Sequence, residues 1–163
     1  MKDLLVRLLA HERKTLEHAV FQRISIKLSE YYKLNRIEQM AYLVEMLEKD
    51  TSSALKQGIN RFETLLDAVG LSGKVPEDTS RAIFELQQVR NVIAHRNGRC
   101  DKRLRSQCPW LRLKLGQKVE IRARQLAVYH TAASDYALEV LYRVGDRYNC
   151  DLRATKKTAP PPT

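Results

Sequence analysis

The sequence has no apolar run long enough to cross a membrane. Its apolar runs are only a few residues long, such as residues 4–6 and 8–10, whereas a transmembrane helix needs about 20. Charges at Lys2, Asp3 and Arg7 interrupt the first ten residues, so no signal peptide is expected. The sequence therefore predicts a cytoplasmic protein with no membrane-spanning part.

Cysteine is scarce, and its spacing favours neither a disulfide framework nor a zinc site. The chain has three cysteines and no CxxC pair, a pattern typical of a reducing compartment. Cys100 and Cys108 have no pair of histidines nearby, and tetrahedral zinc would require four such ligands. Motifs for phosphate-binding loops, dinucleotide binding, zinc proteases and serine hydrolases are also absent. We expect no metal and no cofactor.

Positive charge is abundant and unevenly placed. The 163 residues carry 29 Lys and Arg against 19 Asp and Glu, a net charge of +10. Residues 99–124 alone hold nine basic and two acidic side chains. A local positive field of this kind attracts polyanions, with nucleic acid first and an anionic membrane surface second.

The first 98 residues are predicted to be helical. Apolar residues recur at helical spacing between Lys2 and Tyr32, a stretch without Pro or Gly. Asn35 and Glu38 have the spacing of a capping box and predict a helix start. Residues 50–53 predict a break or a kink, and the apolar pattern then continues to Gly70, a typical C-cap.

Another helix is predicted from Asp78 or Thr79 to about Arg96, ended by residues 97–98. A basic loop over 99–112 and a small β-hairpin or extended segment over 111–121 follow. A last helix is expected over 122–148. These elements predict an all-α fold, an antiparallel bundle of about five helices forming one domain over residues 1–150. Residues 151–163 are expected to be a disordered basic, Pro-rich tail.

The predicted helix over 78–96 has two different faces. At 100° per residue, one narrow arc is apolar and is expected to face the core: Ala82, Leu86, Val89 and Ile93. A second stripe, roughly opposite, is expected to form a wet interface or the wall of a site: Phe84, Gln88, Asn91 and His95. Arg90 lies about 140° from His95 around this helix.

The segment Arg90-Asn91-Val92-Ile93-Ala94-His95 resembles the R-x4–6-H signature of the HEPN superfamily. Residues 85–110 are similar to a branch that includes RNase L-type proteins. The resemblance implies a helical, commonly dimeric domain that acts as a metal-independent endoribonuclease, as in toxin–antitoxin, antiviral-defence or RNA-processing systems. An antitoxin or a larger defence complex is then a further expected partner. Arg13/His18 and Arg124/His130 fit the same expression. The polar Asn, the helix end and the adjacent basic segment distinguish Arg90/His95 from them.

The resemblance implies cleavage by attack of the ribose 2′-OH on the neighbouring phosphate. Arg90, Asn91 and His95 would be catalytic, with His as acid or base and Arg on the phosphorane. Dimerisation through the second stripe would bring two His and two Arg together. The RNA backbone would be held by five basic residues: Arg96, Arg99, Lys102, Arg103 and Arg105. Trp110 would stack on a base or anchor the loop.

Two other functions fit the same sequence. One is a non-catalytic HEPN-like module that dimerises or binds RNA within a larger assembly. The other is a helical adaptor for an acidic protein partner.

Overall fold

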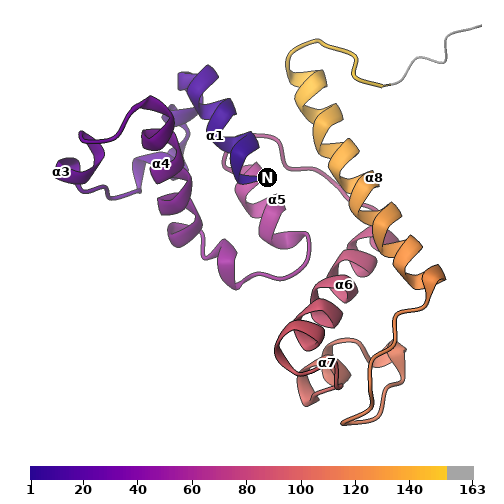
Figure 1. Cartoon of the computed structure of the whole chain (residues 1–163). Helices are drawn as coiled ribbons and strands as arrows, with labels where there is room; N and C mark the ends of the chain where they lie inside the picture. The colour runs from indigo at the N-terminus through magenta and orange to yellow at the C-terminus, as the bar shows by residue number, and fades with distance from the viewer. Residues whose placement is uncertain (154–163) are drawn as a thin grey trace, which may run out of the picture.

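The computed structural model describes residues 1–153 of the chain (Figure 1). Its eight α-helices and three short 3-10 helices confirm the predicted all-α fold. The predicted tail falls mostly outside this range. Residues 151–153 belong to the described part, where the Arg153 guanidinium donates to the Asp146 carboxylate at 2.7 and 2.8 Å.

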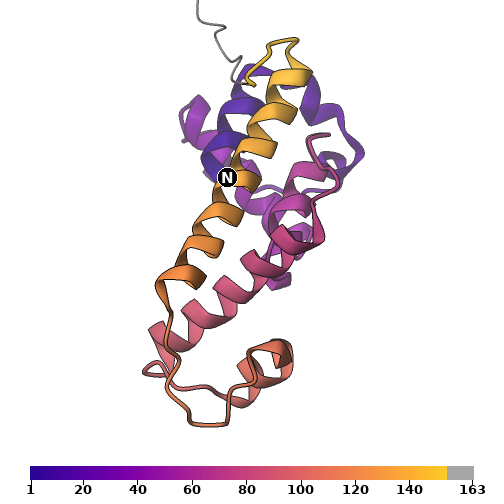
Figure 2. The ribbon, with the colours of Figure 1, turned by 90° about the vertical axis from the view of Figure 1, so that its right-hand side faces the viewer.

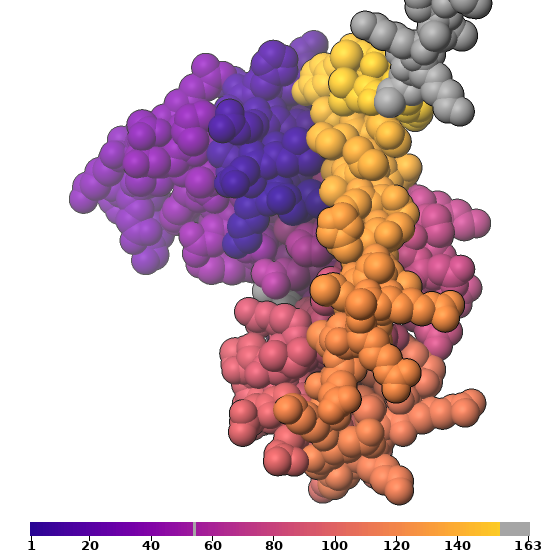
Figure 3. Space-filling view, turned by 45° about the vertical axis from the view of Figure 1, so that its right-hand side comes forward, coloured from indigo at the N-terminus to yellow at the C-terminus, as the bar shows by residue number. Residues whose placement is uncertain are grey.

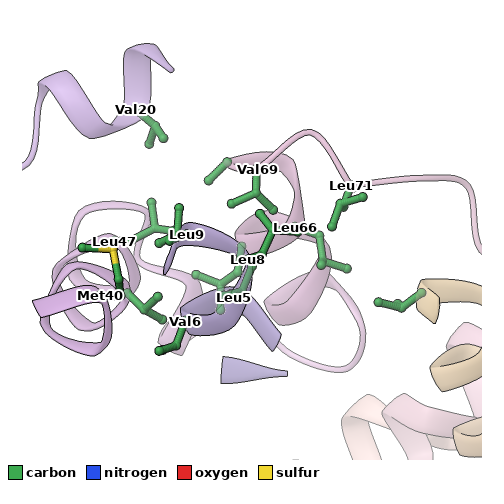
Figure 4. Packing of buried hydrophobic residues seen from close by; sticks show 14 of the residues in the cluster. Leu5, Val6, Leu8, Leu9, Val20, Met40, Leu47, Leu66, Val69 and Leu71 are labelled. Atoms are coloured by element: carbon green, nitrogen blue, oxygen red, sulfur yellow. The ribbon is translucent and has the colours of Figure 1, made fainter. Parts of the chain in front are cut away.

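Three helices of the N-terminal half form the main hydrophobic core. They are α1 (Lys2–His11), α4 (Arg36–Asp50) and α5 (Asn60–Asp67). In Figure 4 the leucines of α1 lie between Met40 and Leu47 on one side and Leu66 and Val69 on the other. Burial of these apolar side chains is the main stabilising term for this half of the molecule.

The predicted start and end of α4 are confirmed. The Asn35 side chain accepts from the backbone N–H groups of Ile37 and Glu38, and Glu38 accepts from the Asn35 N–H at 2.8 Å. Thr51 ends the helix, and Ser52 has a left-handed backbone with φ of 49°. The 3-10 helix η2 (Ser53–Leu55) follows, so the break expected over residues 50–53 occurs.

The continuous helical stretch expected between Lys2 and Tyr32 is broken into four pieces. Helix α1 ends at His11, and three short helices follow: η1 (Arg13–Glu17), α2 (Ala19–Gln22) and α3 (Leu28–Tyr31). The breaks coincide with contacts to the far end of the chain, because the Arg147 guanidinium binds Glu12 at 3.0 Å and Thr15 at 3.3 Å. Such tertiary contacts override local helix propensity.

The C-terminal half is built on the antiparallel pair α6 (Glu77–His95) and α8 (Ala123–Arg147). The two helices are offset, because Glu85 in the middle of α6 contacts Gln125 and Tyr129 near the start of α8. The remainder of α8 packs against the main core through Tyr136 and Val140. Figure 2 shows the result, an elongated molecule in which the C-terminal part of α6 extends away from α1–α5.

A largely buried ion pair links α8 to α5, with side chains 12% and 16% exposed. The Arg143 guanidinium donates to both oxygens of Glu63 at 2.9 and 3.1 Å, and the Tyr136 hydroxyl donates to the same carboxylate at 2.8 Å. Removing one partner of such a pair leaves an uncompensated buried charge.

The segment between α6 and α8 differs from the expected basic loop. It contains α7 (Lys102–Gln107) and the 3-10 helix η3 (Pro109–Leu111). The Asp101 carboxylate accepts from the Leu104 N–H at 2.8 Å and caps α7, a contact that favours helix over loop. After η3, residues 112–122 contain no helix; Arg112 has a left-handed backbone, and a turn follows at residues 115–116.

The β-hairpin expected within residues 111–121 does not form. Residues 116–119 pair instead with residues 98–100 just after α6, through a single antiparallel bridge between Arg99 and Lys118. The Cys100 N–H donates to the Gln117 carbonyl and the Val119 N–H to the Gly98 carbonyl, both at 2.8 Å. Residues 1–153 contain no β-strand beyond this single bridge.

Within residues 1–153, none of the helices combines the length and the apolar character that crossing a bilayer requires.

Candidate functional site

Nearly all of the net positive charge lies at one end of the molecule. Residues 90–124 carry eleven Lys and Arg and only two acidic residues, a net charge of +9. They form the C-terminal end of α6, all of α7 and the connection to α8, at the bottom of Figures 1 and 2. The space-filling view shows side chains from the orange part of this segment projecting outward there (Figure 3). We call this region the basic pole.

A small second core holds the basic pole together. Val89 and Val92 of α6 pack against Cys100, Leu104 and Cys108, all at most 3% exposed. Burial raises the pKa of the Cys108 thiol to about 11, so this thiol is protonated at neutral pH. The two cysteines are therefore packing residues that fix α7 against α6.

Helices α6 and α7 enclose a pocket of about 350 Å³. We call it the α6–α7 pocket. Three side chains of α6 line it at successive turns, namely Gln88, Asn91 and His95, and Arg103 of α7 lines the facing side. His95 is the last residue of α6 and is exposed.

The predicted site residues divide between the pocket and the surrounding surface. Asn91, His95, Arg96 and Arg103 all line the pocket. The Arg96 guanidinium lies 3.7 Å from Asp101. The rest are exposed and do not line it: Arg90, Arg99, Lys102 and Arg105.

Arg90 and His95 do not reach the same pocket from one chain. Both belong to the continuous helix α6, so the five-residue separation places them about 140° apart. Two other guanidinium groups of the same chain, those of Arg96 and Arg103, line the pocket with His95. The catalytic pair implied by the resemblance is therefore not assembled within a single molecule.

The two faces expected for α6 are partly interchanged. Ile93, expected in the core, is 45% exposed, whereas Gln88, expected on the outer stripe, is 2% exposed. The Gln88 amide donates to the Gln57 side chain at 3.0 Å, and Phe84 packs against the second core. Phe84 and Gln88 are covered by the segment between η2 and α5, through Gly58 and Gln57, whereas His95 stays exposed. The whole stripe therefore cannot serve as the predicted dimer face.

A second and larger pocket lies where the first half of α6 meets the start of α8. Its volume is about 540 Å³. Arg81 and Glu85 of α6, Trp110 of η3, and Arg122 and Arg124 beside the start of α8 all line it. We call it the Trp110 pocket.

The Trp110 pocket was not predicted, because its residues lie up to 51 positions apart in the sequence (Asp78 to Tyr129) and share no motif. The available signal was the lone tryptophan inside a basic segment. Trp110 is anchored by two contacts: its indole N–H donates to Glu85, and the Arg81 guanidinium lies 4.3 Å from the ring centre. The side chain is nevertheless 36% exposed.

Among residues 1–153, no three His, Cys, Asp or Glu side chains are grouped so that they could hold a metal ion. In the comparisons with known proteins, no family model, no curated protein and no solved structure matches this chain.

Proposed function

We propose that this protein is a metal-independent endoribonuclease of HEPN type that cleaves RNA at the α6–α7 pocket. One observation carries the proposal. The fold gathers Asn91, His95 and Arg103 around one concave surface, in the middle of a region with a net charge of +9. A toxin or defence effector, with an antitoxin or a larger complex as partner, is the biological role that the resemblance suggests.

The chemistry requires a proton acceptor, a proton donor and a cation beside the phosphate. An exposed His can supply the proton transfers near neutral pH. Asn91 lies one turn before His95 on the same wall of the pocket, where its amide can orient the imidazole or donate to the phosphate. An Arg guanidinium holds two oxygens of a pentacoordinate phosphorane in its planar fork.

The cation could come from the same chain or from a second copy of it, and two substitutions distinguish these sources. Arg103 lines the pocket of its own chain. Arg90 reaches a neighbouring His95 only from a second copy of the chain, as in the dimeric composite site that the resemblance implies. Arg90→Lys would slow cleavage in the composite site and leave it unchanged if Arg103 is used. Arg103→Lys would have the opposite pattern.

The second candidate is an RNA-binding module without catalysis. The observation favouring it is that Arg90 lies about 140° from His95 and outside the pocket. Such a module would bind RNA through the basic pole and leave it intact.

The test is cleavage of a labelled single-stranded RNA in EDTA, compared with binding of the same RNA. His95→Ala should reduce cleavage about a hundredfold or more while binding remains nearly unchanged. Products should end in a 2′,3′-cyclic phosphate. If the purified wild-type protein binds RNA and does not cut it, the binding module is the better description.

A further inference from the structure

We propose that the Trp110 pocket binds one nucleotide unit that carries an amino-bearing base, either free or as an unpaired nucleotide of an RNA strand. The base would occupy the pocket, and its phosphate would lie at the rim against Arg122 and Arg124. The pocket is separate from the α6–α7 pocket, since the two share no lining residue.

The size and walls of the pocket suit a flat ring. A volume of about 540 Å³ lies within the usual range for small-molecule sites. Ala82 and Val128 provide apolar contact on one part of the wall. The Trp110 ring with the Arg81 guanidinium stacked over it at 4.3 Å provides a planar surface. Aromatic rings and guanidinium planes are the groups on which proteins stack unpaired bases.

The rim of the pocket is suited to a phosphate. Arg122 and Arg124 line it and are exposed, so their charge is available to a ligand. They flank the first residue of α8, a 25-residue helix with no acidic residue in its first turn. The positive end of that helix dipole adds to the field of the two guanidinium groups.

The lining of the pocket includes a carboxylate, that of Glu85, which accepts three hydrogen bonds from neighbouring side chains. The buried Tyr129 hydroxyl and the Gln125 amide both donate to Glu85 Oε1 at 2.7 Å, and the Trp110 indole donates to Oε2. These three donors hold the carboxylate in place, and Oε2 retains a lone pair for a ligand. Asp78 adds a second carboxylate to the lining.

Two carboxylates select among the four bases. Adenine, cytosine and guanine each carry an exocyclic amino group that can donate to a carboxylate oxygen. Uracil has carbonyl oxygens in those places, and its single N–H is flanked by two of them. Ionised carboxylates only accept hydrogen bonds, so they repel those carbonyl groups. We therefore expect binding of adenine, cytosine or guanine nucleotides and discrimination against uridine.

The chain contains a direct reporter for this pocket. Trp110 is its only tryptophan, so the intrinsic fluorescence of the full chain monitors the pocket wall. The probes are AMP, CMP, GMP and UMP, together with 2′-O-methyl oligonucleotides that are all-U or all-U with one central A, C or G. The 2′-O-methyl group prevents attack by the 2′ oxygen. The measurement therefore does not depend on the proposed ribonuclease activity and can succeed where that proposal fails.

Quenching should saturate with at least one amino-bearing mononucleotide and should be about tenfold weaker with UMP, the cost of leaving a charged acceptor unpaired. Equal affinity for that mononucleotide and for the strand that contains the same base would assign the pocket to free nucleotides. Much tighter binding of the strand would make it a subsite for RNA.

Three variants complete the test. The double variant Arg122→Glu with Arg124→Glu should abolish quenching. Val128 lines the pocket and is half-exposed, so Val128→Phe should fill part of the pocket and also abolish quenching. The matched control is Arg13→Glu with Arg23→Glu, which makes the same change in charge at exposed positions in the other half of the chain. Quenching that is equal for all four bases, or that persists in both sets of pocket variants, would overturn the proposal.

Discussion

Tyr129 and Glu85 join the two long helices of the C-terminal half through a 2.7 Å hydrogen bond between the Tyr hydroxyl and a carboxylate oxygen. Tyr129 is 2% exposed. Burial and the negative charge of Glu85 together raise the pKa of Tyr129 well above its ordinary value. The contact fixes the position of Glu85 at the base of the Trp110 pocket.

Tyr129→Phe should therefore lower the free energy of unfolding by about 1 kcal/mol at neutral pH. The change removes one donor to Glu85 and keeps the ring that fills the space. Urea unfolding followed by circular dichroism measures the difference. An unchanged stability would show that the hydrogen bond contributes nothing beyond packing.

The same residue should make stability depend on pH in the alkaline range. Because the pKa of Tyr129 is raised in the folded state, its contribution is complete below about pH 10, the ordinary value for Tyr. It is lost as the pH rises further, since the unfolded chain ionises first. One pH unit above that value, the loss is about 1.4 kcal/mol.

Tyr129→Phe should lack this loss, so its deficit relative to wild type should shrink between pH 8 and pH 11. Tyr136, whose pKa is also raised by burial and Glu63, is present in both proteins and does not contribute to the difference. A deficit that stays constant would contradict the raised pKa of Tyr129.

The sequence predicted well those elements that depend on neighbouring residues. The capping box of α4 requires only Asn35 and Glu38, and the end of α6 requires only residues 97–98, both with positive φ. The continuous helix predicted over residues 2–32 was wrong because Glu12 and Thr15 bind Arg147, which lies more than 130 positions away in the sequence. Periodicity within a segment carries no information about such a partner.

The sequence also predicted only the part of the candidate site that depends on neighbouring residues. Asn91 and His95 share a wall because helical spacing dictates it. Whether Gln88 and Ile93 face inward depends on tertiary packing against segments such as the one that contains Gln57, and periodicity within α6 does not reveal those neighbours. The contacts among Arg81, Glu85, Trp110 and Tyr129 are set by tertiary structure alone.

Asp101 should couple the stability of α7 to the charge of the α6–α7 pocket. Its carboxylate caps α7 and lies 3.7 Å from Arg96. Asp101→Ala loses the cap and should destabilise the protein by about 1 kcal/mol. Asp101→Asn keeps a capping oxygen and should preserve stability.

Both Asp101 variants remove a negative charge beside Arg96, so both should bind RNA more tightly than wild type at low salt. Thermal unfolding and fluorescence anisotropy with labelled RNA measure the two effects. Weaker RNA binding by Asp101→Asn would contradict a role for Arg96 in holding the phosphate backbone.

The basic pole should account for most of the salt dependence of RNA binding. Lys102→Glu with Arg105→Glu changes two exposed side chains of α7 that do not line the pocket. The logarithmic slope of affinity against salt should become shallower by up to about two, since fewer counterions are released. Arg13→Glu with Arg23→Glu, which has the same net charge, should retain a steeper slope. Identical slopes for the two double variants would show that binding follows total charge rather than this surface.

The most direct test of the central proposal is the rate of RNA cleavage in EDTA by His95→Ala, measured against His18→Ala and His130→Ala. All three histidines are exposed, and His18 and His130 also follow an Arg at the motif spacing. If catalysis occurs at the α6–α7 pocket, the cleavage rate should fall about a hundredfold or more in His95→Ala alone, and this variant should still bind RNA. Cleavage by His95→Ala at the rate of wild type would contradict catalysis at this pocket.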